Sequence, residues 1–480
     1  MTELYPIVVD LDDTLVLTDT LHENLITLIK NNPVEIFKLP TKLTNGKAAF
    51  KNYVYQNSQL EVDSLPYRKE LIEYLTAKKQ EGHKIILATA ANEEIANTVA
   101  AYLGIFDQVL GSSSSHNLRG ENKLQAIQQY VGKEFIYAGD HSVDLPIWKV
   151  SKGAIIAGNK TSELSKELAK HNIPVIKLFE NPKVTLKTWV KAIRVHQWLK
   201  NGLLFVPLLV SFNFLEISKL LEVFLAFIAF SLGASATYIL NDLWDLSNDR
   251  KHKRKCKRPF ASGVISIPKA VKASIILLTT SFILSYWVSP TFFLIFILYL
   301  IITTLYSLKF KKEVLVDITI LSILYTMRIL AGGVVSNIGL SYWLISFSIF
   351  IFLSLATMKR CGELVSMADS PKNSIVGRGY SKSDLNILWP LGISSYIGAI
   401  ILFGLYINDP ITISNFNLSE GLWGVQLVLF YLVGNLWIKT KHGFMHDDPI
   451  VYLIKDKKSL ILIFIMIILF LISHNGINFN

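Results

Sequence analysis

The apolar positions divide this chain into two halves with different patterns. Up to about residue 185, short apolar runs alternate with segments in which apolar residues recur every three or four positions. After residue 200 the apolar runs lengthen to about 20 residues, enough for a helix to cross a bilayer. We count about nine such runs, near 202–215, 219–240, 269–288, 291–308, 315–336, 341–358, 385–407, 420–438 and 458–474. The pattern predicts two domains: an α/β domain at 1–185 and an all-α polytopic membrane bundle at 186–480.

The basic residues predict how the bundle is oriented. The net charge is +11, and nearly all loop Lys and Arg fall in alternate loops, 241–268, 309–314, 359–384 and 439–457. The intervening loops carry none. This positive-inside pattern predicts a multi-pass membrane protein, in contact with membrane lipids, whose N-terminal domain is cytosolic. It also accounts for the basic charge without a nucleic-acid partner.

Polar residues follow three predicted strands of the N-terminal half. The runs and the residues after them are 6–9 with Asp10, Asp12 and Thr14, 84–88 with Thr89, and 134–138 with Asp140 and Asp144. Helical patterns separate the runs, so we expect a parallel sheet. Ligands of such sheets bind at the carboxyl ends of the strands, so these polar residues should meet at one site.

This order of motifs resembles the haloacid dehalogenase superfamily of phosphatases, over about residues 5–160. The resemblance implies a Rossmann-like fold and an aspartyl-phosphate intermediate. The implied roles are nucleophile for Asp10, general acid/base for Asp12, phosphoryl binding for Thr89 and Lys123, and Mg²⁺ binding for Asp10, Asp12, Asp140 and Asp144. Residues 18–62 read as a small helical cap that selects the substrate. The alternative is a degenerate domain with a purely structural role.

An acidic motif follows the second long apolar run. It reads Asn241-Asp242-x-x-Asp245-x-x-x-Asp249, and on a helix its three carboxylates fall on one face. Such oxygens suit Mg²⁺, which usually shares its coordination shell with substrate phosphates. The next segment, Arg250–Arg258, holds seven Lys or Arg that can bind the remaining phosphate charge. The alternative is a solvated helix end beside a basic membrane anchor.

Within its set of spans, this motif looks like the UbiA superfamily of intramembrane prenyltransferases, over about residues 185–480. Most members ionise a prenyl diphosphate with two Asp-rich motifs and prenylate an aromatic acceptor. The second motif should follow Tyr306-Ser307-x-Lys309, but this stretch offers one aspartate, Asp317. That departure argues against prenyl diphosphate ionisation.

A different branch, the polyprenyl-phosphate (decaprenyl-phosphate) phosphoribosyltransferases, resembles this chain more closely. The matching elements are Arg194-x-His196-Gln197-Trp198-Leu199-Lys200-Asn201, Lys257-Arg258-Pro259, Asp317, Arg328-x-x-x-Gly332-Gly333, Lys359-Arg360-x-x-Glu363 and Arg378-Gly379-Tyr380. Those enzymes transfer phosphoribose from phosphoribosyl diphosphate to polyprenyl phosphate. Two polyanions need more cations than a neutral aromatic acceptor does.

The resemblance implies a role for each polar group. Asp242 and Asp245 would be catalytic and hold Mg²⁺, with Asn241 or Asp249 as a further ligand. The remaining expected substrate-binding residues are Lys253 and Arg258 at the departing diphosphate, Lys200, Lys309, Lys359 and Arg360 at the lipid phosphate or the 5-phosphate, and Tyr306 and Asp317. How the four bases divide between the two phosphates stays open. The lipid phosphate, already an anion, would attack C1 of the ribose without a strong general base.

Together the halves predict a bifunctional enzyme that makes a lipid-linked phosphoribose and then removes its 5-phosphate, for cell-envelope biosynthesis. One rival is an aromatic prenyltransferase with an accessory phosphatase domain. The other is a transporter or lipid-binding protein with a regulatory soluble domain. His446-Asp447-Asp448-Pro449 reads either as a second metal site or, more simply, as a solvated turn.

Overall fold

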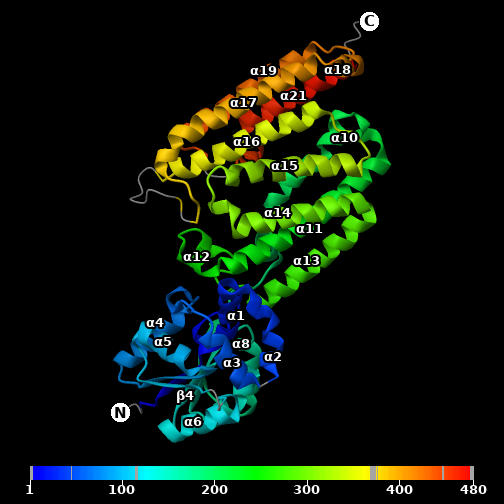
Figure 1. The fold of residues 1–480 in the computed structure, drawn as a ribbon. Coiled ribbons are helices and arrows are strands. Elements are labelled where there is room, and N and C mark those ends of the chain that lie inside the picture. Colours follow the sequence, from blue (N-terminus) through cyan, green and yellow to red (C-terminus); the bar gives the residue numbers. More distant parts are fainter. Residues whose placement is uncertain are drawn as a thin grey trace. The chain divides into compact units, whose positions relative to one another are not determined.

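The computed structural model describes residues 4–44, 46–113, 117–367, 375, 377–445 and 448–475 (Figure 1). The chain forms two compact units. Unit 1 comprises Met1–Ile193 and Tyr238–Ser274, and unit 2 comprises Arg194–Thr237 and Ile275–Asn480. The division passes through two long helices, α11 (Ile217–Trp244) and α13 (Ile267–Val288). The boundary expected at 185/186 stays a prediction.

Unit 1 is built on a six-stranded sheet in the order β3-β2-β1-β4-β5-β6, and every neighbouring pair is parallel. The strands are β1 (Ile7–Val9), β2 (Ile85–Asn92), β3 (Gln108–Ser112), β4 (Ile136–Gly139), β5 (Gly153–Gly158) and β6 (Val175–Glu180). Val9 pairs with Leu87 of β2 and Ala138 of β4. This register brings the carboxyl ends of the three central strands side by side, as the motif order predicts.

Helices cover both faces of this sheet because its strands are apolar on both faces. Ile7 and Val9 point into one buried cluster and Val8 into the other, which is the two-residue alternation of a strand. The helices are α1 (Thr20–Asn31), α2 (Leu39–Leu43), α3 (Lys47–Gln56), α4 (Lys69–Gln80), α5 (Glu93–Leu103), α6 (Glu121–Val131), α7 (Leu145–Val150), α8 (Thr161–Lys170) and α9 (Leu186–Ala192). The first three, α1 to α3, lie in the predicted cap segment, residues 18–62. The α/β fold class is confirmed.

Unit 1 also contains the end of α11, the short helix α12 (Leu246–Lys251) and the beginning of α13. Asp245 lies between α11 and α12 with φ −101° and ψ 17°, so the acidic motif spans a break rather than one continuous helix. Arg250 of α12 donates two hydrogen bonds to Glu23 of α1, at 2.7 and 3.1 Å. The segment that carries the acidic motif therefore packs within unit 1.

Eight helices of the described chain are long and apolar enough to cross a membrane. They are α11, α13, α14 (Pro290–Leu308), α15 (Val316–Val335), α16 (Tyr342–Val365), α17 (Leu385–Ile407, within the span Lys382–Ile407), α19 (Gly421–Lys441) and α21 (Lys457–Asn475). Shorter helices are α10 (Val206–Val210), α18 (Pro410–Asn415) and α20 (Pro449–Lys455). The protein is a multi-pass membrane protein with a helical bundle, as the apolar runs predict.

The ninth expected span, near 202–215, was wrong. This stretch consists of a 3-10 helix (Val195–Phe205), the five-residue α10 and a 3-10 turn at Asn213–Leu215. Pro207 lies in the first turn of α10 and Phe212 is left-handed (φ 57°), so no continuous helix forms. Leu204 and Leu208 of this stretch are instead buried within unit 2. A Cβ on Gly332 of α15 would lie 2.0 Å from the Leu204 carbonyl oxygen. Gly332 thus allows close backbone packing.

Candidate functional site

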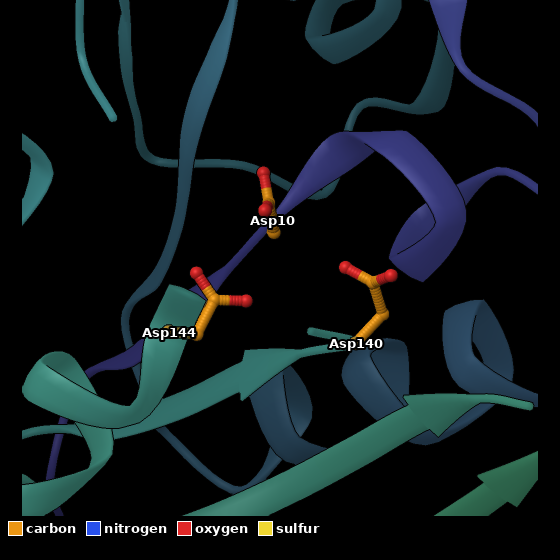
Figure 2. A group of neighbouring side chains, drawn as sticks. All are labelled: Asp10, Asp140 and Asp144. Carbon is orange, nitrogen blue, oxygen red and sulfur yellow. The ribbon is translucent and has the colours of Figure 1, made fainter. Parts of the chain in front are cut away.

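Three carboxylates converge at the carboxyl ends of the central strands of unit 1. Asp10 follows β1, Asp140 follows β4, and Asp144 precedes α7; Figure 2 shows the three side chains around one space. One oxygen from each lies within 4.8 Å of the others. Lys123 of α6 donates a 2.7 Å hydrogen bond to Asp10 Oδ2 and lies 3.8 Å from Asp144 Oδ1. The structure therefore brings together four residues that the sequence assigned to one site.

The electrostatics of this group favour a divalent cation. Burial, followed by the charges of Asp10 and Asp144, raises the pKa of Asp140 to about 8. Burial also raises the pKa of Asp144, and its buried Oδ2 has no hydrogen-bond partner in the described part of the chain. Among the described residues, Lys123 is the lysine that pairs with these acids. Clustered carboxylate oxygens with excess negative charge fit a hard cation such as Mg²⁺.

Two other predicted phosphatase residues lie in the same region but have different partners. Asp12 Oδ1 accepts a 2.8 Å hydrogen bond from the Thr20 amide, so its carboxylate is not part of the three-acid group. Burial and the neighbouring Asp19 raise the pKa of Asp12 well above its ordinary value. Thr89 is fully buried in β2, and its Oγ1 accepts a 3.0 Å hydrogen bond from the Ala91 amide.

Arg68 supports the loop after β1, a role that the sequence did not reveal. Its buried guanidinium donates to the carbonyl oxygens of Thr14 (2.9 Å) and Asp13 (3.0 Å) and, across the fold, to that of Phe179 (3.3 Å). Asp13 has a left-handed backbone with φ 55°. Arg68 therefore holds a strained turn directly beyond the two catalytic candidates.

Two carboxylates of the acidic motif at the end of α11 share a single arginine of the same segment. Arg258 Nη1 donates to Asp242 Oδ1 (3.0 Å) and forms a closer ion pair with Asp249. Asp242 and Asp249 thus both contact Arg258. The break at Asp245 interrupts the single helix on which all three carboxylates were expected to share one face. In the described chain these acids do not form a three-carboxylate group of the kind found around Asp10. The predicted Lys253 is exposed in the turn after α12, and Asn241 and Asp245 are partly buried.

Part of the basic run after this motif forms ion pairs with acids near the N-terminus. Arg250 forms its bidentate ion pair with Glu23, and both side chains are less than a tenth exposed. Lys251 pairs with Glu61 at 2.7 Å and Asp63 at 3.3 Å. Two of the seven bases that the sequence offered for phosphate therefore hold the cap segment instead.

In unit 2, Asp448 is shared by two lysines. Lys200 and Lys359 donate to its Oδ2 at 2.7 and 3.0 Å, and Tyr325 donates to the same oxygen at 3.2 Å. The Asp448 side chain is only 8% exposed, so its interpretation as part of a solvated turn was wrong. His446 and Asp447 of that motif lie outside the described residues. The cluster carries one net positive charge and joins two of the predicted substrate bases.

Asp317 lies at the centre of a second cluster in unit 2. The carboxylate is completely buried and pairs with Arg360, which is also completely buried. It accepts a 3.0 Å hydrogen bond from Arg378 and a 2.7 Å one from the Tyr306 hydroxyl. Arg360 donates in addition to Glu363 at 2.6 Å. Lys309, the other predicted base of this stretch, is exposed at the end of α14.

A third buried cation of unit 2 lies in the middle of α15. Arg328 donates to Asn201 Oδ1 (2.9 Å), the Tyr299 hydroxyl (2.7 Å) and the Leu324 carbonyl (2.5 Å). Its guanidinium lies 5.6 Å from the centre of the Phe230 ring. Across the residues that the structure describes, no carboxylate pairs with Arg328. Buried charge of this kind in a span is costly and usually serves function.

Comparison with known proteins identifies this class of membrane enzyme. A sequence model of the UbiA prenyltransferase family matches residues 204–449, and one of haloacid dehalogenase-like hydrolases matches residues 7–149. The chain belongs to the UbiA prenyltransferase family and carries an N-terminal haloacid dehalogenase-like domain. Both resemblances inferred from the motifs are confirmed.

Individual relatives cover the chain to different extents. The uncharacterised protein y4nM of Sinorhizobium fredii is 34% identical over 95% of this chain and 88% of its own length. The decaprenyl-phosphate phosphoribosyltransferase of Mycobacterium tuberculosis is 34% identical over 45% of this chain and 72% of its own length. A UbiA homolog from Archaeoglobus fulgidus, solved with GPP and Mg²⁺, aligns at 18% identity with a TM-score of 0.44 and covers 60% of this chain and 99% of that one.

Proposed function

We propose that the protein transfers 5-phosphoribose from phosphoribosyl diphosphate to polyprenyl phosphate, and that its N-terminal domain then removes the 5-phosphate. The observation that carries the first step is the pairing of Asp317 with Arg360 and Arg378. At the position where a prenyltransferase would use a second metal-binding motif, this chain has a carboxylate already neutralised by two arginines. Such a site favours phosphate anions over a second metal ion.

The abundance of cations supports a reaction between two polyanions. Lys200 and Lys359 share the single charge of Asp448, which leaves one positive charge for a phosphate. Arg328 adds a buried guanidinium without a carboxylate partner in the described chain. The similarity to the Mycobacterium tuberculosis decaprenyl-phosphate phosphoribosyltransferase points to the same pair of substrates. An aromatic acceptor would have no use for this charge.

The transfer replaces one C–O bond at C1 of the ribose with another. A lipid phosphate oxygen forms the new bond to C1 as the bond to the diphosphate breaks, and the diphosphate leaves with the electron pair. Asp242 and Asp245 would hold Mg²⁺, which neutralises the leaving diphosphate. Arg258 already contacts Asp242, and its positive charge would offset the negative charge that the diphosphate gains. Carboxylates nearby would stabilise positive charge that develops at C1.

The phosphatase step would use the carboxylate site of unit 1. Asp10 attacks the phosphorus of the 5-phosphate, and the sugar oxygen departs with a proton from Asp12. Water then hydrolyses the aspartyl-phosphate and releases inorganic phosphate. Lys123 would offset the repulsion between Asp10 and the phosphate dianion, and a cation that Asp140 and Asp144 would hold could supply further positive charge there. The raised pKa of Asp12 suits a group that must carry a proton at neutral pH.

The charges of the loops support a location for these reactions. The loops that contain Asp242, Lys309, Lys359 and Asp448 are the basic ones, so we place them and the N-terminal domain on the cytosolic side of a bacterial inner membrane. Phosphoribosyl diphosphate is a soluble substrate and would reach the enzyme from that side.

The test uses full-length protein in detergent with labelled phosphoribosyl diphosphate, polyprenyl phosphate and Mg²⁺. We expect a labelled lipid whose 5-phosphate is removed by the wild type and retained by Asp10→Asn. Asp242→Asn should strongly reduce labelling, whereas Glu216→Gln, at an exposed acid just before α11, should leave it unchanged. Absence of labelled lipid, together with prenylation of an aromatic acceptor from a prenyl diphosphate, would overturn the proposal.

A further inference from the structure

A small pocket lies beside Asp12 between the cap segment and the end of β2. The cap contributes Asn24 of α1 and Lys51 of α3, and the opposite wall contains Asn92 and Ile95. Since Asp12 is the candidate acid that protonates the departing sugar oxygen, this pocket lies on the leaving-group side of the phosphate site. Its lining therefore meets the part of the substrate that remains after phosphate is removed.

Lys51 is the cation of this pocket. Its ammonium donates one 2.7 Å hydrogen bond, to the Ala90 carbonyl oxygen, and forms no ion pair in the described chain. An ammonium has three N–H donors, so two remain for a ligand. Ala90 O also accepts a 3.0 Å hydrogen bond from Ser112 Oγ, so it keeps a partner when Lys51 turns away.

Both amide side chains of the same pocket already form hydrogen bonds. Asn24 donates to the Thr20 carbonyl and accepts from Ser58, and Asn92 caps α5 through the Glu94 amide. Each amide NH₂ keeps a second N–H, but neither amide carries a charge that would distinguish an anion from a neutral group. Charge recognition in this pocket therefore depends on Lys51.

We propose that Lys51 recognises a second anionic group on the substrate of the phosphatase domain, on the leaving-group side of the ester. The substrate class is a sugar phosphomonoester that carries a further phosphate. This inference rests on the proposed function, because a lipid-linked phosphoribose carries a phosphodiester at C1 in addition to its 5-phosphate.

The pocket must open for such a substrate. Its volume of about 10 Å³ is about the space that one water molecule needs. Entry of a sugar therefore displaces α3 from β2 and breaks the bond between Lys51 and Ala90. The substrate anion then replaces the carbonyl as the partner of the ammonium, and this exchange favours doubly charged substrates.

The experiment compares two synthetic substrates on the full-length protein. One is a methyl riboside 5-phosphate, and the other has a methyl phosphodiester at C1 of the same 5-phosphate. Each has a single hydrolysable phosphomonoester, so released phosphate reports the same bond. The wild type should show a higher kcat/KM for the diester compound, and Lys51→Met should lose about 10- to 100-fold on that substrate alone. Lys51→Arg should retain most of the preference.

Lys38→Met is the matched control, because Lys38 is an exposed cap lysine already paired with Glu35. It should leave both substrates unchanged. An equal loss on both substrates in Lys51→Met, or a wild type without preference for the diester compound, would overturn the inference. Because neither substrate contains a lipid, failure of the lipid-labelling assay would contradict the proposed transfer reaction without removing a charge preference measured here.

Discussion

Replacement of Asp317 by asparagine distinguishes between two possible roles of this carboxylate, which are to position arginines or to bind a metal ion. The substitution keeps the shape of the side chain and removes its charge, which leaves Arg360 and Arg378 without their shared partner. Removal of one member of a buried ion pair costs about 3–5 kcal/mol. Because Glu363 still pairs with Arg360, we expect the free energy of unfolding to fall by about 3 kcal/mol, near the lower end of that range. The variant should therefore still fold.

The assay is lipid labelling over a range of Mg²⁺ and phosphoribosyl diphosphate concentrations, with the melting temperature of the same protein in detergent. If Asp317 positions arginines that bind phosphate, Asp317→Asn should raise the KM for a phosphorylated substrate by about tenfold, equal to about 1.4 kcal/mol of lost binding. The Mg²⁺ concentration for half-maximal activity should stay unchanged. Asp242→Asn is the contrast, because it should shift the Mg²⁺ requirement of any residual activity.

The opposite pattern would refute this reasoning. A shift of the Mg²⁺ requirement in Asp317→Asn, with an unchanged KM, would mean that the carboxylate binds metal despite its two arginines. The protein would then resemble prenyltransferases with two metal motifs.

Three further predictions concern unit 1. A Cβ on Gly139 would lie 2.6 Å from Asp144 Oδ2, so Gly139→Ala should displace that carboxylate and lower phosphate release at least about tenfold without affecting lipid labelling; normal phosphate release would contradict the metal role of Asp144. Asp140, whose pKa is raised from 3.8 to about 8, holds a proton in the metal-free protein between these values, so the stability of that form should fall as pH rises through this window. Mg²⁺ must displace the proton, so its affinity measured by calorimetry should fall about tenfold per pH unit below 8, and a constant affinity from pH 6 to 8 would exclude this linkage. Glu23→Gln should reduce the free energy of unfolding of the full chain by about 3 kcal/mol and so lower its melting temperature. Adding Arg250→Met to the same protein should recover part of the lost stability, and purely additive losses would show that the two residues are not coupled.

The parts of the site that could be predicted are those fixed by local pattern. Asp10 and Asp140 follow short apolar strands, and parallel strands place their carboxyl ends together, so the sequence alone predicts that they meet. Lys123 lies 113 positions from Asp10 and was assigned only through the family resemblance. The long apolar runs likewise predict eight spans correctly.

The features that were missed depend on partners far apart in the chain. Lys200 and Asp448 are separated by 248 positions, and nothing near either residue indicates that they pair. The Glu23–Arg250 ion pair is a similar case, because its two residues lie 227 positions apart, one in a cap helix and the other in a basic run. The span expected at 202–215 was wrong for another reason: its residues are largely apolar, but Pro207 and the left-handed Phe212 prevent a continuous helix.

The balance of buried charge differs between the carboxylate site of unit 1 and the basic clusters of unit 2. In unit 1, three clustered carboxylates face one lysine, an excess of negative charge that a divalent cation would offset. In the three clusters described for unit 2 the excess has the opposite sign, because five bases face three acids; the bases are Lys200, Lys359, Arg360, Arg378 and Arg328, and the acids are Asp448, Asp317 and Glu363. Buried charges persist only when a partner or a ligand offsets their desolvation. A protein that binds a metal with one set and phosphates with the other can tolerate both imbalances, and a purely structural membrane protein would have no reason to keep either.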